Sequence, residues 1–361
     1  MRLVSTCAVP DGSRLGRDLP APPGGAPLLR AGAVIADSER EFLFHKGVSQ
    51  VYVEDEIGAG IEIPEPLSEG TRRQARAAVS RAFRDATRMP GTLLPHDCLD
   101  ELTAAARTIV DEIGAVGDRA FAFPDLAGPE DYNLEHSIDA TVVGLLVGRR
   151  LIDSDELVEL GTGLFIQDIG KLALPPHLVH KPGPLAPAER ELMMQHPLLG
   201  LEFLRDDDLG FGPRSVVRSH HERWDGSGYP NGISREQISP LARIAAAADV
   251  FDAVTSERWY ATAEPQAVGV ETIRAGAGTA FDPEVADAFC DVIAPHPAGS
   301  EIELADGRRG VVVSVPDDAV RAPLVRMLDS GQEIDLAREP ALRVQPIRSS
   351  AAPTTVSASI S

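Results

Sequence analysis

Six side chains of types that bind metal ions lie in the middle and later parts of the sequence, and they are the clearest candidates for chemical function in the chain. Seven of the nine histidines fall between residues 125 and 296. Imidazole nitrogens and carboxylate oxygens together suit Fe, Mn or Zn, and helices that face one core can bring such ligands together. The predicted metal ligands are His136, Asp168, His196, His220, His221 and Asp249.

Such a ligand set predicts phosphoester hydrolysis. A carboxylate can bridge two metals because it has two oxygens, and a hydroxide held between metals ~3.5–4 Å apart attacks a phosphodiester in line. Lys171 could add a cation for a phosphoryl oxygen. Simpler interpretations exist for each residue alone: a single histidine is more often a surface or satisfied core residue, and Asp168 could form a salt bridge with Lys171 across a helix end.

Apolar periodicity predicts two of the helices that would position these ligands. His136 is expected to open a helix whose apolar face runs to Val147. A second helix is expected to carry Asp168 at the end of the face that begins at Leu157. An acidic residue at the end of a core-facing stripe is costly unless it is paired or metal-bound.

The adjacent histidines His220 and His221 need a special position. Neighbouring residues of a regular helix point in different directions, so both rings can face one site only at a helix end or a distortion. The Gly-Ser-Gly sequence at residues 226–228 favours a helix end.

The last two ligands are placed by their neighbours. His196 is predicted to close the helix that starts near Pro187. Asp249 lies inside the small, apolar helix predicted over residues 245–254, where the pattern expects a core residue rather than a carboxylate.

The composition predicts a cytoplasmic protein with a packed core. Hydrophobic residues make up 43% of the 361 residues, and 34 basic against 55 acidic residues give a net charge of −21. An acidic surface argues against binding nucleic acid or an anionic membrane non-specifically, and no run approaches the ~18 apolar residues of a membrane span. Three widely spaced cysteines fit a reducing compartment, and the first residues lack the apolar stretch of a signal peptide.

The chain is predicted to be mainly α, with a helical metal-binding domain between two small modules. Helix and strand signals over Asp37 to Lys46 and Val51 to Val53 predict an N-terminal α+β module. Alternating and β-branched residues around the hairpin signal Asp306-Gly307 predict a C-terminal β module. The predicted divisions are 1–65 for the first module, 66–124 for a helical linker, 125–296 for the catalytic domain, 297–348 for the β module and 349–361 for a disordered tail.

The predicted linker contains two helices, Glu69 to Met89 and Leu99 to Val116. Such a pair could mediate a homodimer or pack within its own chain.

Four sequence runs together resemble the HD-GYP domain over about residues 125–296. The most specific is HHERWDGSGYP, from His220 to Pro230. The others are DIGK from Asp168 to Lys171, the pair His196-Pro197, and DVFDAVTSER from Asp249 to Arg258.

This resemblance implies a helical HD fold, a centre of two or three metal ions, and hydrolysis of cyclic di-GMP. One or two divalent ions per chain, Fe or Mn, are expected as cofactors. Carried over by position, one metal would be held by His136, Asp168 and Asp249. The other would be held by Asp168, His196, His220 and His221, with Asp168 as the bridge.

The resemblance also implies roles around the metals. Asp168 and Lys171 would take part in catalysis, and Lys171 and Arg258 would contact the substrate phosphate. Tyr229 belongs to the GYP loop, which in the family lies near the site and serves as an interaction surface. Tyr229 is therefore expected to bind substrate together with Lys171 and Arg258, and the loop could contact a protein partner.

Three departures from the family pattern affect these expectations. Gln167 stands where the family has the histidine of its HD pair, and an amide oxygen is a weaker ligand than imidazole. Tyr132 replaces the glutamate of members with a third metal, and Glu135 is out of phase, so a third metal is not expected. Trp259 and Ala261 replace a proline and a basic residue, which predicts a weaker hold on phosphate.

Four interpretations follow from these patterns. The protein could be an active phosphodiesterase on cyclic di-GMP, a degenerate member that binds the dinucleotide or a protein partner without turnover, a hydrolase of another nucleotide, or a purely structural helical domain. Metal content separates the last from the rest, and turnover separates the first from the second.

Overall fold

The computed structural model describes most of the chain. The described residues are 1–19, 27–46, 48, 50–88, 93–116, 121, 132–181, 183–204, 209–256, 263–317, 319–339 and 341–345. Several sequence-based predictions lie outside them: the disordered tail 349–361, the boundary between residues 124 and 125, the helix end at Met89, the phosphate contact of Arg258, and the positions Trp259 and Ala261.

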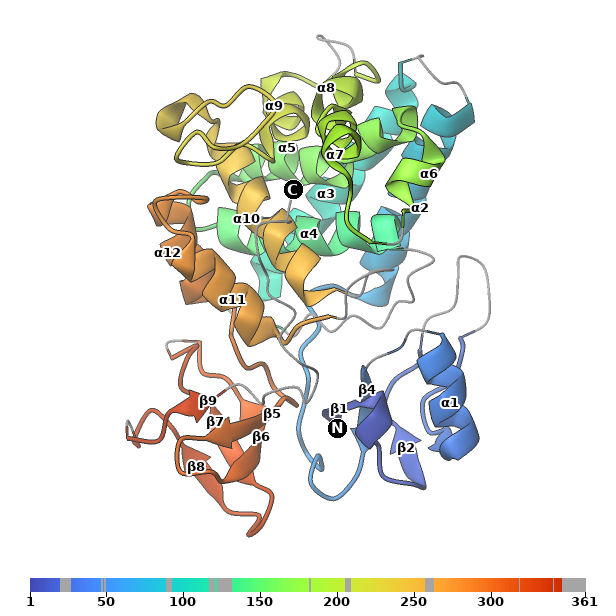
Figure 1. The fold of residues 1–361 in the computed structure, drawn as a ribbon. Coiled ribbons are helices and arrows are strands. Elements are labelled where there is room, and N and C mark those ends of the chain that lie inside the picture. Colours follow the sequence, from blue (N-terminus) through green and yellow to red (C-terminus); the bar gives the residue numbers. More distant parts are fainter. Residues whose placement is uncertain are drawn as a thin grey trace.

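The protein is mainly α, as predicted, with one small antiparallel sheet near each end of the chain (Figure 1). None of the helices in the described ranges is long and apolar enough to cross a membrane. The helices and 3-10 turns are η1 Thr6–Ala8, α1 Asp37–His45, α2 Glu69–Arg88, α3 His96–Val116, α4 Tyr132–Gly148, α5 Ser154–Phe165, η3 Ile169–Ala173, α6 Pro176–Val179, α7 Pro187–Met193, α8 His196–Leu201, α9 Phe211–Ser219, η4 Arg235–Gln237, α10 Pro240–Thr255, α11 Gln266–Ala275 and α12 Pro283–Val292.

The N-terminal sheet has the strand order β1-β4-β2-β3 and is accompanied by α1. The predicted helix and strand of this module are confirmed, and α1 begins at Asp37 with Ala36 as its N-cap. The strands are β1 Arg2–Ser5, β2 Ser13–Leu15, β3 Val34–Ile35 and β4 Gln50–Glu54.

The C-terminal sheet has five antiparallel strands in the order β8-β7-β6-β5-β9. Its first hairpin turns at Asp306-Gly307, as predicted, with Gly307 at φ 85°, a conformation that glycine adopts without steric cost. The strands are β5 Glu301–Leu304, β6 Arg309–Ser314, β7 Leu324–Met327, β8 Glu333–Asp335 and β9 Val344–Gln345.

The two small sheets pack against each other below the helices (Figure 1). The Leu3 N–H donates to the Gly299 carbonyl oxygen at 2.9 Å. Tyr52 and Val311 share one hydrophobic cluster, and the Arg2 guanidinium pairs with Glu301, the first residue of the C-terminal sheet, at 3.4 Å. The two small sheets therefore form one packed unit.

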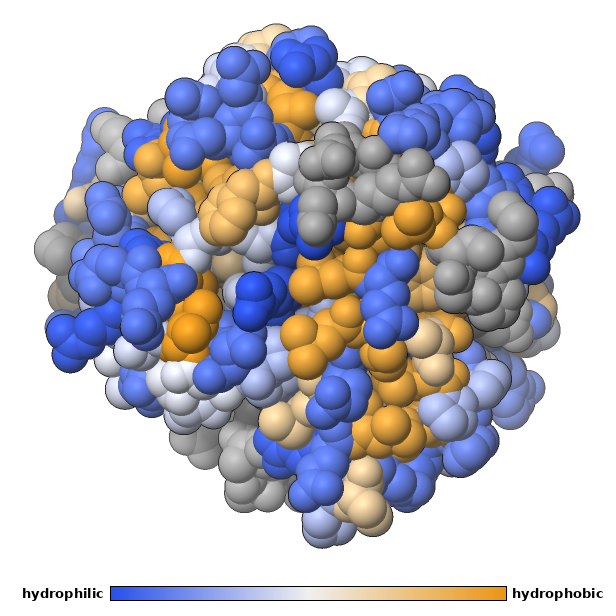
Figure 2. All heavy atoms as spheres, turned by 90° about the horizontal axis from the view of Figure 1, so that it is seen from above, coloured by the Kyte–Doolittle hydropathy of each residue, from blue (hydrophilic) through white to orange (hydrophobic). Residues whose placement is uncertain are grey.

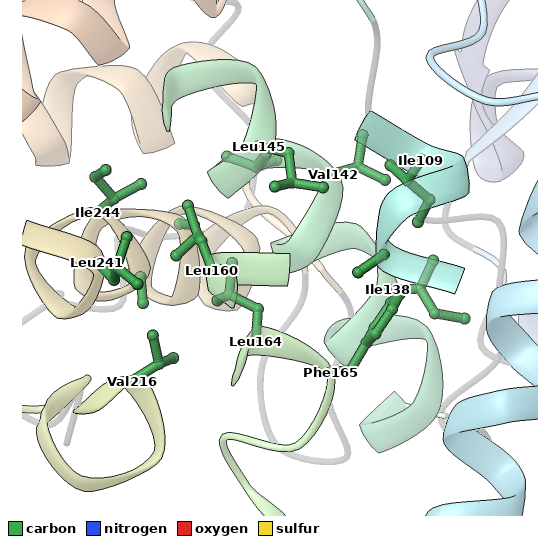
Figure 3. Packing of buried hydrophobic residues seen from close by; sticks show 14 of the residues in the cluster. Ile109, Ile138, Val142, Leu145, Leu160, Leu164, Phe165, Val216, Leu241 and Ile244 are labelled. Atoms are coloured by element: carbon green, nitrogen blue, oxygen red, sulfur yellow. The ribbon is translucent and has the colours of Figure 1, made fainter. Parts of the chain in front are cut away.

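The helical domain is built around the buried helix α4, which packs against α5 and α10. Apolar side chains from these helices and from α3 and α9 interdigitate in its core (Figure 3). Removing such apolar surface from water is the main favourable term in folding. The core residues shown in the figure include Ile109, Ile138, Val142, Leu145, Leu160, Leu164, Phe165, Val216, Leu241 and Ile244.

Three predicted helix ends are wrong, and each moves a candidate ligand. The helix α4 begins at Tyr132, so His136 lies one turn inside it. The helix α5 ends at Phe165, so Asp168 lies in the turn before η3 rather than on the helix. His196 begins α8 instead of closing α7, because Pro197 stands in the first turn of the new helix, where its missing N–H costs nothing.

Candidate metal centre

The structure gathers the six predicted ligands at one end of the helical domain, in two groups that meet at Asp168. The first group is Asp168, His196, His220 and His221, whose ligand atoms all lie within 4.8 Å of one another. The second group consists of His136 on α4 and Asp249 on α10, which lie beside Gln167.

A glycine lets the chain segments that carry Asp168 and His196 approach each other. The η3 turn packs directly on the start of α8, and a Cβ at Gly170 would lie 2.0 Å from the His196 carbonyl oxygen and 2.4 Å from the Gly200 nitrogen. No side chain fits at such distances, so Gly170 permits the contact that brings Asp168 beside His196.

His220 and His221 lie at a helix end, as predicted. His220 is the C-cap of α9, and the following loop folds back so that the Tyr229 N–H donates to the His221 carbonyl oxygen at 3.2 Å. Gly228 makes this return possible, because a Cβ there would lie 2.5 Å from the same carbonyl oxygen. The adjacent rings can therefore face one site.

Backbone carbonyls fix the ring orientation of two histidines. The His196 Nδ1 lies 2.9 Å from the Met193 carbonyl oxygen, and the His220 Nδ1 lies 3.1 Å from the Val216 carbonyl oxygen. A carbonyl oxygen only accepts, so each Nδ1 carries the proton and each Nε2 presents a lone pair. Metal-binding histidines are commonly held in this way.

The Nε2 lone pairs of His196 and His220 face the Asp168 carboxylate, and no hydrogen-bond donor of the described residues lies between these three acceptors. The Nε2 atoms of His196 and His220 lie 3.3 Å apart, and the Asp168 Oδ1 lies 3.3 Å from the first and 3.8 Å from the second. Asp168 Oδ1 is buried and accepts no hydrogen bond. Buried acceptors are unfavourable unless they meet a donor or a cation, so this donor set fits a divalent metal.

The electrostatic setting keeps this group in its metal-binding form. Burial opposes ionisation of Asp168, but the Lys171 ammonium and the neighbouring histidines hold its pKa well below the usual range. Burial lowers the pKa of His220 to about 4, and burial, together with the nearby His220 ring, also lowers the pKa of His221. An ionised carboxylate and neutral imidazoles are the forms that bind metals.

The second group is linked by hydrogen bonds instead, although the buried Gln167 Oε1 accepts none. The Gln167 Nε2 donates to the Asp249 Oδ1 at 3.0 Å, and the His136 Nε2 lies 3.0 Å from the same oxygen. The reverse orientation of the amide would set its oxygen against the carboxylate. Burial opposes the charge on His136, but hydrogen bonds to Asp249 and Asp252 raise its pKa to about 10.

Asp252 is a site residue that the sequence interpretation missed. Its Oδ2 lies 2.6 Å from the His136 Nδ1, and the Ser256 hydroxyl donates to its Oδ1 at 3.1 Å. Asp252 therefore sets the orientation of the His136 ring. The signal was present: Asp252 stands three residues after Asp249 in the same apolar helix, and it is as anomalous there as Asp249.

The other predicted site residues differ in how closely they approach the metal ligands. The Lys171 Nζ forms an ion pair with the Asp168 Oδ2 at 2.6 Å, as the simpler interpretation of this pair predicted. The Tyr229 ring stacks on His221 with centroids 4.7 Å apart, and its hydroxyl is buried without a hydrogen-bond partner. Arg258 lies outside the described residues. Glu135 on α4 is paired at 3.3 Å with Arg72, which lies on α2, a helix that carries none of the predicted ligands.

Figure 2 looks from above onto the end of the molecule at which α7, α8 and α9 lie. Hydrophobic residues gather in a broad patch beside strongly hydrophilic side chains near the centre of the view. The exposed large hydrophobic residues of η3, α7 and α8 are Leu172, Leu192 and Leu198. The end of the molecule at which α7, α8 and α9 lie thus carries an apolar patch, although the whole chain is acidic.

Similarity to known proteins agrees with this geometry. Residues 138–285 match a family described as HD domain. A cyclic di-GMP phosphodiesterase of Pseudomonas aeruginosa is 35% identical over 279 residues, which are 73% of this chain and 65% of that protein. A cyclic di-GMP phosphodiesterase of Thermotoga maritima is 39% identical over 127 residues, 34% of each chain. A 3'3'-cGAMP-specific phosphodiesterase of Vibrio cholerae is 36% identical over 124 residues, 34% of this chain and 24% of that protein.

The chain spans just under two thirds of the Pseudomonas relative and about a third of the Thermotoga one. The family match includes most of α4 and all of α5 to α11, the helices and turns that carry the first ligand group and Asp249. Residues 138–285 of this chain are thus similar to HD domains, and this stretch includes Gln167 and all of the candidate ligands except His136.

Proposed function

We propose that the protein is a metal-dependent phosphodiesterase that hydrolyses cyclic di-GMP. The observation that carries this proposal is the convergence of the His196 and His220 lone pairs on the buried, unpartnered Asp168 Oδ1. A purely structural domain has no reason to bury three acceptors against one another. The cyclic di-GMP specificity rests on the relatives, whose names state that substrate.

The residues divide into metal holders and substrate contacts. Asp168, His196, His220 and His221 would hold one divalent ion, Fe or Mn, and His136, Asp168 and Asp249 would hold a second one more weakly. A bound ion lowers the pKa of water and neutralises charge on a phosphoryl group. Lys171 and Arg258 would hold phosphate oxygens, and Tyr229 would keep the His221 ring in place through the stacking contact.

The geometry supports at most two ions. The third-metal position of the family would need a carboxylate where Tyr132 stands. Glu135, the nearest carboxylate in sequence, is engaged by Arg72 at 3.3 Å and by Arg76 at 2.5 Å. With two ions or fewer, we expect the linear dinucleotide to accumulate, with slow or no conversion to GMP.

The test is turnover of cyclic di-GMP by the purified chain, with added Mn(II) or Fe(II) and with metal analysis of the same sample. 3'3'-cGAMP serves as the competing substrate. Faster hydrolysis of cyclic di-GMP than of 3'3'-cGAMP supports the proposal. Preference for 3'3'-cGAMP would change the substrate, and absence of hydrolysis of either at any metal concentration would contradict an enzymatic role.

A second candidate function is binding of the dinucleotide or a protein partner without turnover. The Gln167 hydrogen bond to Asp249 favours it, because it gives that carboxylate a partner without a metal. Equilibrium dialysis with cyclic di-GMP under the turnover conditions separates the two functions. Saturable binding with intact ligand recovered would support the second candidate.

A further inference from the structure

A cavity of about 400 Å³ lies away from the metal ligands, where the end of the helical domain continues into the C-terminal sheet. Pro295 and His296, just after α12, line it. The other lining residues come from three segments of the C-terminal module, around residues 321–322, 336–337 and 342–344. Its volume falls in the range of roughly 300–1,000 Å³ that is common for small-molecule sites.

The polar groups of this cavity are all basic. His296, Arg321 and Arg343 line it, and none of its nine lining residues is acidic. This is unusual in a chain of net charge −21. Neither guanidinium forms an ion pair with a carboxylate of the described residues, and the His296 ring forms no hydrogen bond there. Burial lowers the pKa of His296 to about 4, so at neutral pH the ring offers one donor and one acceptor.

The rest of the cavity wall is apolar. Leu336, Leu342 and Val344 contribute aliphatic surface, together with Pro295. An apolar wall with a few convergent polar groups is the usual pattern of a small-molecule site. Arginine guanidiniums are well suited to phosphate and carboxylate, because they can donate two parallel hydrogen bonds.

We propose that this cavity binds a small organic anion, whose phosphate or carboxylate meets Arg321 and Arg343 while its apolar body lies against Leu336 and Leu342. The proposal is independent of the metal centre and of the hydrolytic function. It assigns a role to three basic side chains that phosphodiester chemistry does not use.

The cavity is connected to the helical domain on its Arg321 side. Burial raises the pKa of the Cys290 thiol on α12, and the neighbouring Arg321 guanidinium opposes that rise. The Gln266 side chain on α11 donates to the Ala294 carbonyl oxygen at 2.8 Å, two residues before His296. A bound anion would thus contact the junction between the helical domain and the C-terminal sheet.

The test uses phenylphosphonate and benzoate as probes, with phenol as the uncharged control, in calorimetric titrations of the full chain. We expect one saturable site for at least one anionic probe and none for phenol. The two anions distinguish a phosphate-type from a carboxylate-type ligand. Each titration is repeated on metal-depleted protein, because a phosphonate could also bind at the metal centre.

Arg321→Ala and Arg343→Ala are each expected to weaken probe binding by about tenfold or more, the usual effect of losing a charge-assisted hydrogen bond. Arg338→Ala is the matched control, because Arg338 is 86% exposed, pairs with Asp335 and does not line the cavity. Circular dichroism establishes that each variant is folded, and Arg343→Lys, which keeps the charge, should retain part of the affinity. Absence of a saturable anion site, its loss on metal depletion, or an equal loss in Arg338→Ala would overturn the proposal.

Discussion

The two halves of the candidate metal centre share Asp168 but differ in how far their polar atoms are hydrogen-bonded. Around His196 and His220, acceptor atoms face one another and Asp168 Oδ1 has no partner. Around His136, the Asp249 carboxylate already accepts from the Gln167 amide and lies 3.0 Å from the imidazole. The first half presents unpaired lone pairs that a cation would stabilise. In the second half the Asp249 carboxylate is already hydrogen-bonded, and the Gln167 Oε1 is the atom left without a partner.

This difference shows how a glutamine at position 167 affects the second half of the candidate metal centre. An imidazole at position 167 would add a ligand, but the amide there acts as a donor and occupies an oxygen that a metal would need. A metal entering the second half must displace those hydrogen bonds, and each is worth about 0.5–1.5 kcal/mol net, or more when charged. In the first half, a metal relieves buried acceptors that each cost about 1–3 kcal/mol when unsatisfied. We therefore expect unequal metal affinities.

The largest effect is expected from removing a ligand of the first half. His221→Ala should take the protein from about one tightly held ion to nearly none, with a loss in affinity of at least about a hundredfold, because no other described ligand can replace the ring. Metal analysis after dialysis measures this. His177→Ala is the matched control, since His177 is exposed on α6, outside the cluster. Unchanged metal content in His221→Ala would mean that the first half is not the tight site.

The next largest effect on metal content is expected from adding a histidine ligand to the second half. Gln167→His exchanges an amide donor for an imidazole ligand, and we expect it to raise bound metal from about one to about two ions and to increase cyclic di-GMP hydrolysis at limiting Mn(II). Gln167→Leu is the control, because it removes the hydrogen bond to Asp249 without adding a ligand. If Gln167→His equals the wild type in metal content and rate, the amide does not limit this protein.

The fold class and the identity of the clustered ligands could be predicted from the sequence, because they depend on local signals. The run from His220 to Pro230 is specific in itself, and apolar periodicity shows that Asp249 is out of place in its helix. The predicted helix end at His220 is also correct, since two adjacent rings can share a site only at such an end.

The remaining features could not be predicted because they depend on long-range packing. The break after α5, which moves Asp168 off the helix, accompanies the close contact of Gly170 with the His196 carbonyl oxygen, 26 residues later in the chain. The orientation of the Gln167 amide depends on Asp249, 82 residues away. The ring position of His136 depends on Asp252, 116 residues away.

A smaller effect, confined to the second half, is expected from Asp252→Asn. The substitution keeps the volume but removes the charge that orients the His136 ring, and loss of such a supporting partner typically weakens metal binding by about 10–100-fold. The effect should appear in the double variant Asp252→Asn, Gln167→His as a weaker affinity for the second ion than in Gln167→His alone. Competition with a chelator measures this affinity. The first ion should be unaffected, and weakening of both ions together would show that the two halves do not act separately.

The smallest effect concerns a contact from outside the HD domain. Arg72 on α2 pairs with Asp139 at 2.7 Å and with Glu135 at 3.3 Å. These two carboxylates precede and follow His136 on α4, so Arg72 anchors the turn of the helix that carries this histidine. Arg72→Ala should lower the free energy of unfolding by about 1–2 kcal/mol, because it removes charge-assisted hydrogen bonds from a partly buried pair. Arg73→Ala is the control on the same helix: Arg73 is 74% exposed and lies 4.0 Å from Glu69, so a change of less than about 0.5 kcal/mol is expected.

Urea unfolding of both variants measures the difference in stability, and chelator competition in the Gln167→His background shows where it acts. Because Arg72 contacts α4, its loss should weaken the second ion by a few-fold and leave the first ion, held by residues of α8 and α9 with Asp168, at its wild-type affinity. Equal stabilities of Arg72→Ala and Arg73→Ala would show that α2 does not support the second half. Loss of the first ion in Arg72→Ala would show that α2 supports the whole centre, and the contrast between the two halves would then come from Gln167 alone.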